Sequence, residues 1–221
     1  MEIQAVIWDM DGTLLDTEPC YMEAEGSIVK RCVGGDIAEV THALLGKTEN
    51  DSANIVINHF KLPISKEEYL KERYINLMRL LPNAQVLPGV WELVNEFELR
   101  GIRQGVATSS PKHLLELKRN AHPDLFNRFQ TVVCGDDVKN GKPDPEIFLL
   151  TAQNLDVAPE NCLVFEDAPA GLIGAKRAGM KAVGILNPHV NKSLYEECIP
   201  DALFTSWTEF SLDRLNANIS K

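Results

Sequence analysis

Short apolar runs alternate with helical patterns along this chain, and that alternation constrains the fold more than any other feature of the sequence. The runs are four to six residues long, end in polar residues, and cover 3–8, 102–107, 131–134, 162–165 and 181–186. Continuous apolar runs, rather than strict alternation of apolar and polar residues, are typical of parallel strands that are covered on both faces. We therefore predict an α/β fold: an open, parallel, Rossmann-like sheet with helices on both faces.

Helix start and stop signals support this order of elements. The segment 90–100 has the apolar period of a helix and stops at Gly101, a residue type that commonly follows the last helical turn. Ser110 before Pro111 predicts a serine cap with proline as the first helical residue. Further helices are expected at 145–152 and at 168–178.

Residues 17–84 interrupt the alternation. This stretch is helical throughout, with predicted helices at 21–33, 36–45, 50–60 and 65–81. Ser65 and Glu68 have the pattern of a capping box at the start of the last helix. A helical insertion after the first strand should lie over the carboxyl ends of the strands, where open α/β sheets bind their ligands. We predict a core of 1–16 and 85–221 and a small α-helical cap of 17–84.

A set of charged and hydroxyl side chains stands at or near the predicted strand ends. Taken alone, each is explained as a turn residue, a cap residue or a solvated lysine. In a parallel sheet the strand ends share one edge, so these residues can converge although they are far apart in the chain. Four carboxylates together need a counter-charge, for which Mg²⁺ is the natural cation, and a lysine and a hydroxyl beside it would hold a phosphoryl group. The residues are Asp9, Asp11, Thr108, Lys142, Glu166 and Asp167.

Charge and cysteine usage limit the partners and the location. With 22 basic and 32 acidic residues the formal charge is −10, which argues against binding to nucleic acid or to an anionic membrane. No apolar run approaches the roughly 18 residues that span a bilayer, and the first residues have no secretory pattern. Five widely spaced cysteines favour reduced thiols over disulfides or zinc. We expect a cytoplasmic, monomeric protein whose partner is a small phosphorylated metabolite.

Four segments resemble the motifs of the haloacid dehalogenase superfamily. Asp9–Asp16, which reads Asp-Met-Asp-Gly-Thr-Leu-Leu-Asp, resembles the first motif, and Thr108 after its apolar run is similar to the second. Lys142 in Gly-Lys-Pro-Asp-Pro is similar to the third, and the pair Glu166 and Asp167 to the fourth. The helical cap is similar to that of the β-phosphoglucomutase-like branch. Within that branch, the residues around the motifs look most similar to the pseudouridine-5′-phosphatases and their sugar-phosphatase relatives.

That resemblance implies a phosphatase that forms an aspartyl phosphate. Asp9 would be the nucleophile, and Asp11 the general acid and then the general base. Thr108 and Ser109 would bind the phosphoryl oxygens, while Lys142 would pair with the nucleophile and the phosphate. The implied cofactor is Mg²⁺. Its implied ligands are Asp9, Asp11 through its backbone carbonyl, Glu166 directly or through water, and Asp167.

Other activities of this fold can be weighed on the same residues. Haloacid dehalogenases use the same nucleophile but lack the second aspartate of the first motif, which is Asp11 here. The β-phosphoglucomutases carry histidine where Tyr21 stands and arginine where Glu49 stands, and both departures argue against mutase activity. A non-catalytic regulatory protein would have no reason to keep unpaired carboxylates that cost stability. Lys47, in a loop between cap helices, is either a solvated lysine or a specificity contact to the substrate.

Overall fold

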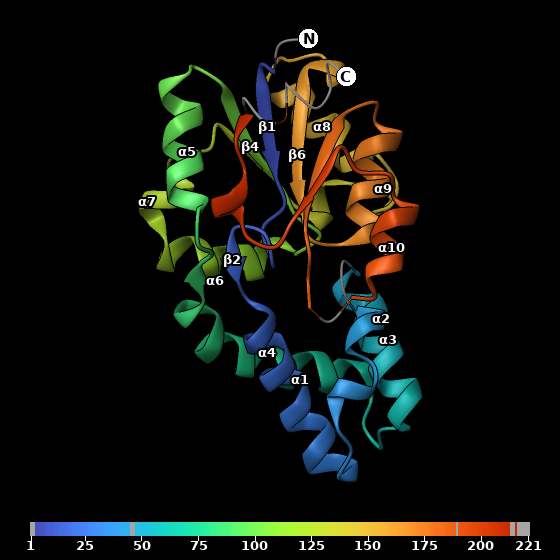
Figure 1. Ribbon diagram of the computed structural model, residues 1–221. Coiled ribbons are helices and arrows are strands. Elements are labelled where there is room, and N and C mark those ends of the chain that lie inside the picture. Colours follow the sequence, from blue (N-terminus) through green and yellow to red (C-terminus); the bar gives the residue numbers. More distant parts are fainter. Residues whose placement is uncertain (1–2, 45–46, 189, 213–214, 216–221) are drawn as a thin grey trace.

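The strands form a parallel sheet at the centre of the molecule. The computed structural model describes residues 3–44, 47–188, 190–212 and 215. Among them six strands lie in the order β5-β4-β1-β6-β7-β8, each parallel to its neighbours (Figure 1). Because β4 and β6 flank β1, the ends of these three strands lie side by side. The strands are β1 Ala5–Trp8, β4 Arg103–Ala107, β5 Thr131–Val133, β6 Cys162–Glu166, β7 Lys181–Ile185 and β8 Ala202–Phe204.

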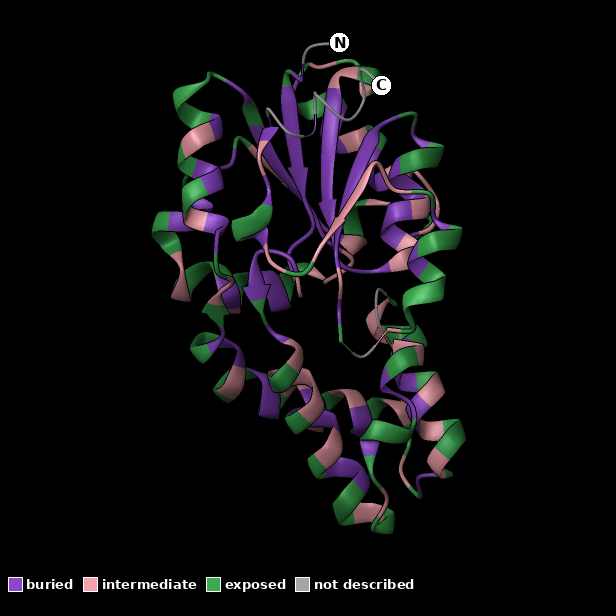
Figure 2. Cartoon of the chain, in the orientation of Figure 1, coloured by how far each residue is buried: buried purple, intermediate pink, exposed green. Residues whose placement is uncertain are grey.

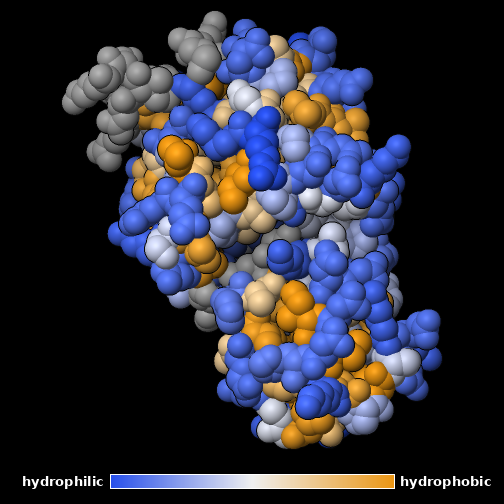
Figure 3. All heavy atoms as spheres, turned by 90° about the vertical axis from the view of Figure 1, so that its right-hand side faces the viewer, coloured by the Kyte–Doolittle hydropathy of each residue, from blue (hydrophilic) through white to orange (hydrophobic). Residues whose placement is uncertain are grey.

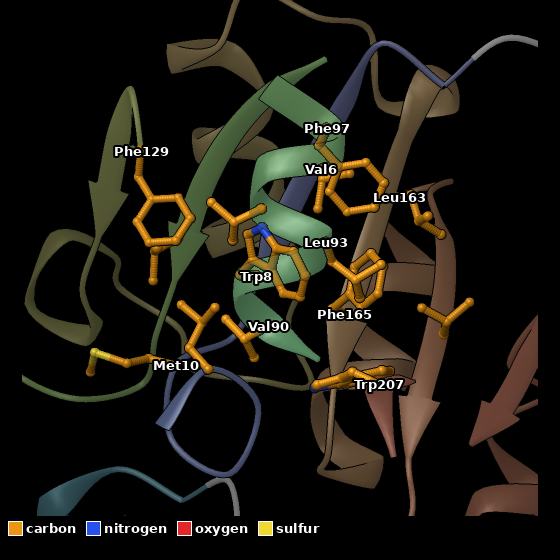
Figure 4. Close-up of a cluster of buried hydrophobic side chains, with 14 of the residues drawn as sticks. Val6, Trp8, Met10, Val90, Leu93, Phe97, Phe129, Leu163, Phe165 and Trp207 are labelled. Atoms are coloured by element: carbon orange, nitrogen blue, oxygen red, sulfur yellow. The ribbon is translucent and has the colours of Figure 1, made fainter. Parts of the chain in front are cut away.

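Both faces of the sheet are covered, and Figure 2 shows the central strands buried along their length. Successive residues of a strand point to opposite faces, and accordingly Trp8 belongs to one apolar cluster and Ile7 to another. On the first face the rings of Trp8 and Phe165 stack with their centroids 4.2 Å apart (Figure 4). The helices around the sheet are α5 Val90–Leu99, α6 Lys112–Ala121, α7 Pro123–Phe126, α8 Glu146–Asn154, α9 Pro169–Arg177 and α10 Lys192–Glu197.

All five strands predicted from the apolar runs are present, which confirms the predicted α/β fold. The sequence did not predict β8, nor the two-stranded antiparallel ribbon of β2 Leu15–Asp16 and β3 Gln85–Val86. Strands of two or three residues are too short to carry a periodic pattern. The ribbon pairs residues from either side of the helical segment, so the chain leaves the sheet layer and returns to it at one place.

The helices between β2 and β3 lie beyond one end of the sheet (Figure 1). They are α1 Glu18–Val33, α2 Thr41–Leu44, α3 Glu49–Phe60 and α4 Lys66–Leu80, and they enclose their own apolar cluster around Val29, Val56 and Tyr69. The capping box is present: Glu68 N donates to Ser65 Oγ at 3.2 Å, and Ser65 N donates to Glu68 Oε2 at 2.8 Å.

The predicted continuous helix over 36–45 is wrong. A 3₁₀ helix at Ile37–Glu39 ends at Val40, where the backbone leaves helical geometry, and α2 starts after it; residue 45 lies outside the described residues. The start of α6 also differs from the prediction. Pro111 precedes this helix with an extended backbone, and Ser110 does not cap it, because the Ser110 hydroxyl donates to Asp11 at 2.7 Å.

Candidate active site

The carboxyl edge of the sheet gathers the residues that the sequence placed at strand ends. Asp9 follows β1, Thr108 follows β4, Glu166 ends β6 and Asp167 comes directly after it, while Lys142 reaches in from the loop between β5 and α8. All five are buried. They are brought together because β1 lies between β4 and β6 in the sheet.

Lys142 holds two of the carboxylates. Its Nζ donates to Asp9 Oδ1 at 2.5 Å, to Glu166 Oε1 at 2.7 Å and to the Ala107 carbonyl at 3.0 Å. Burial would lower the pKa of Lys142, but the charges of Asp9 and Glu166 raise it, so the lysine stays protonated. Burial raises the pKa of Asp9 to about 7 in spite of the lysine.

Asp9, Glu166 and Asp167 can together hold a metal ion. Each offers a carboxylate oxygen, and these three oxygens lie within 4.8 Å of one another. Burial and the neighbouring charges of Glu166 and Asp9 raise the pKa of Asp167 well above its usual value. The single positive charge of Lys142 therefore does not balance the negative charge of these three carboxyl groups. A hard divalent cation with oxygen ligands, such as Mg²⁺, fits such a group.

Two glycines leave room for the carboxylates. Gly12 has a positive φ of 79°, and a Cβ at this position would lie 2.3 Å from Asp167 Oδ2. A Cβ at Gly171 in α9 would lie 1.7 Å from Glu166 Oε1. Any other residue type at either position would push a carboxylate out of place, so the glycines help to set the geometry of the acidic group.

Asn187 donates a hydrogen bond to the Asp167 carboxylate, and this residue was not predicted from the sequence. Its Nδ2 donates to Asp167 Oδ2 at 3.0 Å and to Glu18 Oε2 at 3.1 Å. The Tyr195 hydroxyl donates to the backbone carbonyl of Asp167. A signal for Asn187 was available, because it directly follows the apolar run 181–186, which is the position that selected the other site residues.

The Asp11 side chain has different partners from those of Asp9. Its carboxylate accepts from Thr17 Oγ1 at 2.7 Å, from Ser110 Oγ at 2.7 Å, and from Lys118 Nζ at 2.6 and 2.7 Å. Burial alone would raise the pKa of Asp11, but the Lys118 charge and these hydrogen bonds hold it below the usual value. Lys118 was not predicted from the sequence either, and it is completely buried although it lies in the amphipathic helix α6.

A cleft runs from this edge of the sheet toward the helices α1 to α4. Figure 3 shows that the surface is hollowed between the larger upper part of the molecule and the smaller lower part. Thr108 and Ser109 line the cleft at the sheet, and Lys47 lines it from the helical side, where the lysine is exposed. Glu49 also lines the cleft and accepts a hydrogen bond from Arg73 at 3.1 Å. The cleft thus has charged and polar groups at both ends.

Buried carboxylates around one lysine lie at the carboxyl edge of a parallel sheet and at the foot of a cleft, which is where open α/β sheets bind their ligands. Residues 3–179 match the family model of the haloacid dehalogenase-like hydrolases. The chain therefore belongs to this family. It is a phosphatase, the activity for which the two relatives described next are named.

Two relatives and one solved structure illustrate the similarity. A probable pseudouridine-5′-phosphatase of Drosophila melanogaster is 37% identical, over 84% of this chain and 83% of its own. A phosphorylated carbohydrates phosphatase of Thermotoga maritima is 35% identical, over 82% of this chain and 84% of its own. The crystal structure of a putative beta-phosphoglucomutase from Thermotoga maritima superposes with a TM-score of 0.76 at 32% identity, covering 100% of this chain and 99% of that one.

Proposed function

We propose that this phosphatase is a Mg²⁺-dependent phosphomonoester hydrolase that works through an aspartyl phosphate on a nucleoside or sugar phosphate. The observation that carries the proposal is the contact of Lys142 with both Asp9 and Glu166, with Asp167 completing an acidic group of metal-binding size. That arrangement provides a nucleophile, a fixed positive charge and a metal site at one place. Phosphoryl transfer needs these three provisions more than any other.

In the proposed reaction an Asp9 oxygen attacks phosphorus, and the bond to the leaving oxygen breaks. Asp11 gives that oxygen a proton, then takes one from the water that attacks the phosphorylated Asp9 and releases inorganic phosphate. Lys142, Thr108 and Ser109 bind the phosphoryl oxygens. Bound Mg²⁺ would be held by Asp9, Glu166, Asp167 and the Asp11 carbonyl, and would neutralise negative charge on the phosphoryl group.

We further propose that residues 17–84 act as a cap that contacts the leaving group. The cleft between these helices and the sheet supports this assignment, with Lys47 and Glu49 on the helical side. Glu49 accepts a hydrogen bond from Arg73 and so pairs with a positive charge that would otherwise be open to a second phosphate, which argues against a mutase reaction. A neutral polyol or nucleoside, such as that of pseudouridine-5′-phosphate, suits such a wall.

The proposed setting is a monomer in the cytoplasm. One chain supplies every side chain of the proposed site. All five cysteines are free, which suits a reducing compartment. Within the described residues, no helix has the length and apolar character needed to cross a membrane.

Turnover of p-nitrophenyl phosphate and of a panel of phosphorylated metabolites tests the proposal. EDTA should abolish turnover and Mg²⁺ should restore it. The panel should contain pseudouridine-5′-phosphate, ribose 5-phosphate, glycerol 3-phosphate and β-glucose 1-phosphate, with both phosphate release and isomerisation measured. Isomerisation of the glucose phosphate without release of phosphate would instead identify a mutase. Full activity in EDTA would contradict the assigned metal site.

A further inference from the structure

Lys118 is a completely buried lysine that the proposed chemistry does not yet use. It lies in α6, whose neighbouring charged residues Lys112 and Arg119 point to solvent. Moving an ammonium group from water into the interior is costly unless the group is paired and hydrogen-bonded. The burial of Lys118 therefore depends on the groups that its ammonium contacts.

The hydrogen bonds of the Lys118 ammonium go to Asp11, the proposed acid and base, and to two hydroxyls beside it. Nζ lies 2.6 and 2.7 Å from the two oxygens of Asp11, 2.9 Å from the Tyr21 hydroxyl and 3.0 Å from Ser110 Oγ. Contact with both oxygens fixes the position of the carboxylate, and the hydroxyls of Thr17 and Ser110, each donating to a different oxygen, fix its plane. Because Tyr21 belongs to α1, the lysine also ties Asp11 to the helical segment.

Lys118 also sets the direction of the neighbouring hydrogen bonds. An ammonium group can only donate, so the Ser110 oxygen accepts from Lys118 and the Ser110 proton is left for Asp11. Thr17 donates to the other Asp11 oxygen at 2.7 Å. Without the lysine the Ser110 hydroxyl could turn away, and the carboxylate would lose its only charged partner among these contacts.

We propose that Lys118 is a positioning residue for catalysis, which holds the Asp11 carboxylate in the orientation that serves the leaving oxygen and the attacking water. This inference rests on the proposed aspartyl-phosphate chemistry. Lys118 acts through Asp11, the carboxylate to which its two shortest hydrogen bonds go. A positioning role differs from a purely structural role in its effect on the two chemical steps. Replacing a positioning lysine should slow the step that needs Asp11 and leave the other step unchanged.

The test is Lys118→Met, which keeps the length and the apolar stem of the side chain and removes the donor. With p-nitrophenyl phosphate, formation of the phosphorylated enzyme needs no proton donor, since nitrophenolate leaves as an anion. A rapid-mixing experiment should therefore show a burst approaching one nitrophenolate per enzyme. Steady turnover after it should be about 10- to 100-fold slower than in the wild type, because attack by water needs Asp11. Lys112→Met, in the same helix and in a surface ion pair with Asp137, should behave as the wild type.

A comparison with Asp11→Asn separates positioning from folding. If Lys118 acts through Asp11, the double variant Lys118→Met/Asp11→Asn should turn over no more slowly than Asp11→Asn alone. A structural role would instead add its loss to that of Asp11→Asn and would reduce the burst together with the folded fraction. The double variant buries no unpaired charge at this place. If Lys118→Met alone does not fold, the double variant, in which the side chain at position 11 carries no charge, still allows the comparison with Asp11→Asn.

The outcomes distinguish this inference from the proposed function. Wild-type turnover without dependence on a divalent cation, or none at all, overturns both. Normal metal-dependent turnover in the wild type, together with unchanged turnover in Lys118→Met, overturns the role of Lys118 alone. An additive loss in the double variant does the same.

Discussion

At the scale of single residues, two aspartates only two positions apart have opposite electrostatic surroundings. Asp9 lies among Glu166 and Asp167 with one lysine, and burial raises its pKa to about 7. Asp11 points to Lys118 and two hydroxyl donors, and its pKa is held below the usual value. The same residue type thus has a raised pKa at one position and a lowered pKa at the other, and an ionised Asp11 is ready to accept a proton from the attacking water.

Replacing each aspartate by asparagine should separate these roles. Asp11→Asn should still form the phosphorylated enzyme from p-nitrophenyl phosphate, but should hydrolyse it about 10²–10⁴-fold more slowly, the usual contribution of a general acid–base group. The expected signal is a burst of nitrophenolate followed by slow turnover. Asp9→Asn lacks the nucleophile and should show neither phase while keeping a cooperative thermal transition. The opposite pattern, a burst in Asp9→Asn and none in Asp11→Asn, would mean that the roles are reversed.

At the scale of elements, Thr48, which directly precedes α3, contacts the loop that carries Lys142. A Cβ at Gly141 would lie 3.2 Å from the methyl carbon of Thr48, so Thr48 and this loop are in close contact. Thr48 is also the N-cap of α3, and its hydroxyl accepts from Asp51 N at 3.2 Å. Thr48 thus joins the start of α3 to this loop, and its neighbour Lys47 lines the cleft.

Lys47→Ala should change which substrate is used and leave the chemical steps intact. Because Lys47 lines the cleft from the helical side, it can contact the leaving group, and its loss should raise KM for the best substrate of the panel about 3- to 10-fold. Turnover of p-nitrophenyl phosphate should stay within about twofold of the wild type. Lys30→Ala, an exposed lysine near the end of α1, is the matched control and should alter neither value. Equal losses on both substrates would place Lys47 in catalysis or in folding.

At the scale of the whole molecule, the acidic group links stability to pH and to metal. In the unfolded chain Asp9 titrates near 3.8, whereas in the folded protein its pKa is about 7, so the folded state binds the proton more tightly. This proton-linked stability is present below pH 4 and is lost as the pH rises through 7. The raised pKa of Asp167 acts in the same direction. The lowered pKa of Asp11 matters only at more acidic pH.

Thermal unfolding without metal should therefore give a Tm that falls between about pH 5 and pH 8. Mg²⁺ should raise the Tm more at pH 8 than at pH 5, because protons compete for the same carboxylates. At a concentration of 100 times Kd the gain is about 2.7 kcal/mol, or several degrees for a chain of this size. Asp9→Asn should flatten the pH dependence and reduce the shift. A Mg²⁺ shift that is equal at both pH values would contradict binding at this group.

The sequence by itself determined the sheet and most of the proposed site. Apolar runs locate β1, β4, β5, β6 and β7, because strands buried on both faces need unbroken apolar residues. In a parallel sheet the strand ends meet at one edge, so placing Asp9, Thr108, Glu166 and Asp167 at strand ends was sufficient to bring them together. This part of the prediction depends only on local patterns and on one geometric rule.

Only the tertiary structure decided which partners the site residues have. Lys118 lies in an amphipathic helix, where the pattern cannot distinguish a solvated lysine from a buried one; the approach of Asp11, Ser110 and Tyr21 decides it. In the same way Asp9 and Asp11 are equivalent in the sequence. Their pKa values differ in the folded protein because different elements pack against each side chain. Charge pairing and burial arise from contacts between distant segments, and local sequence carries no record of them.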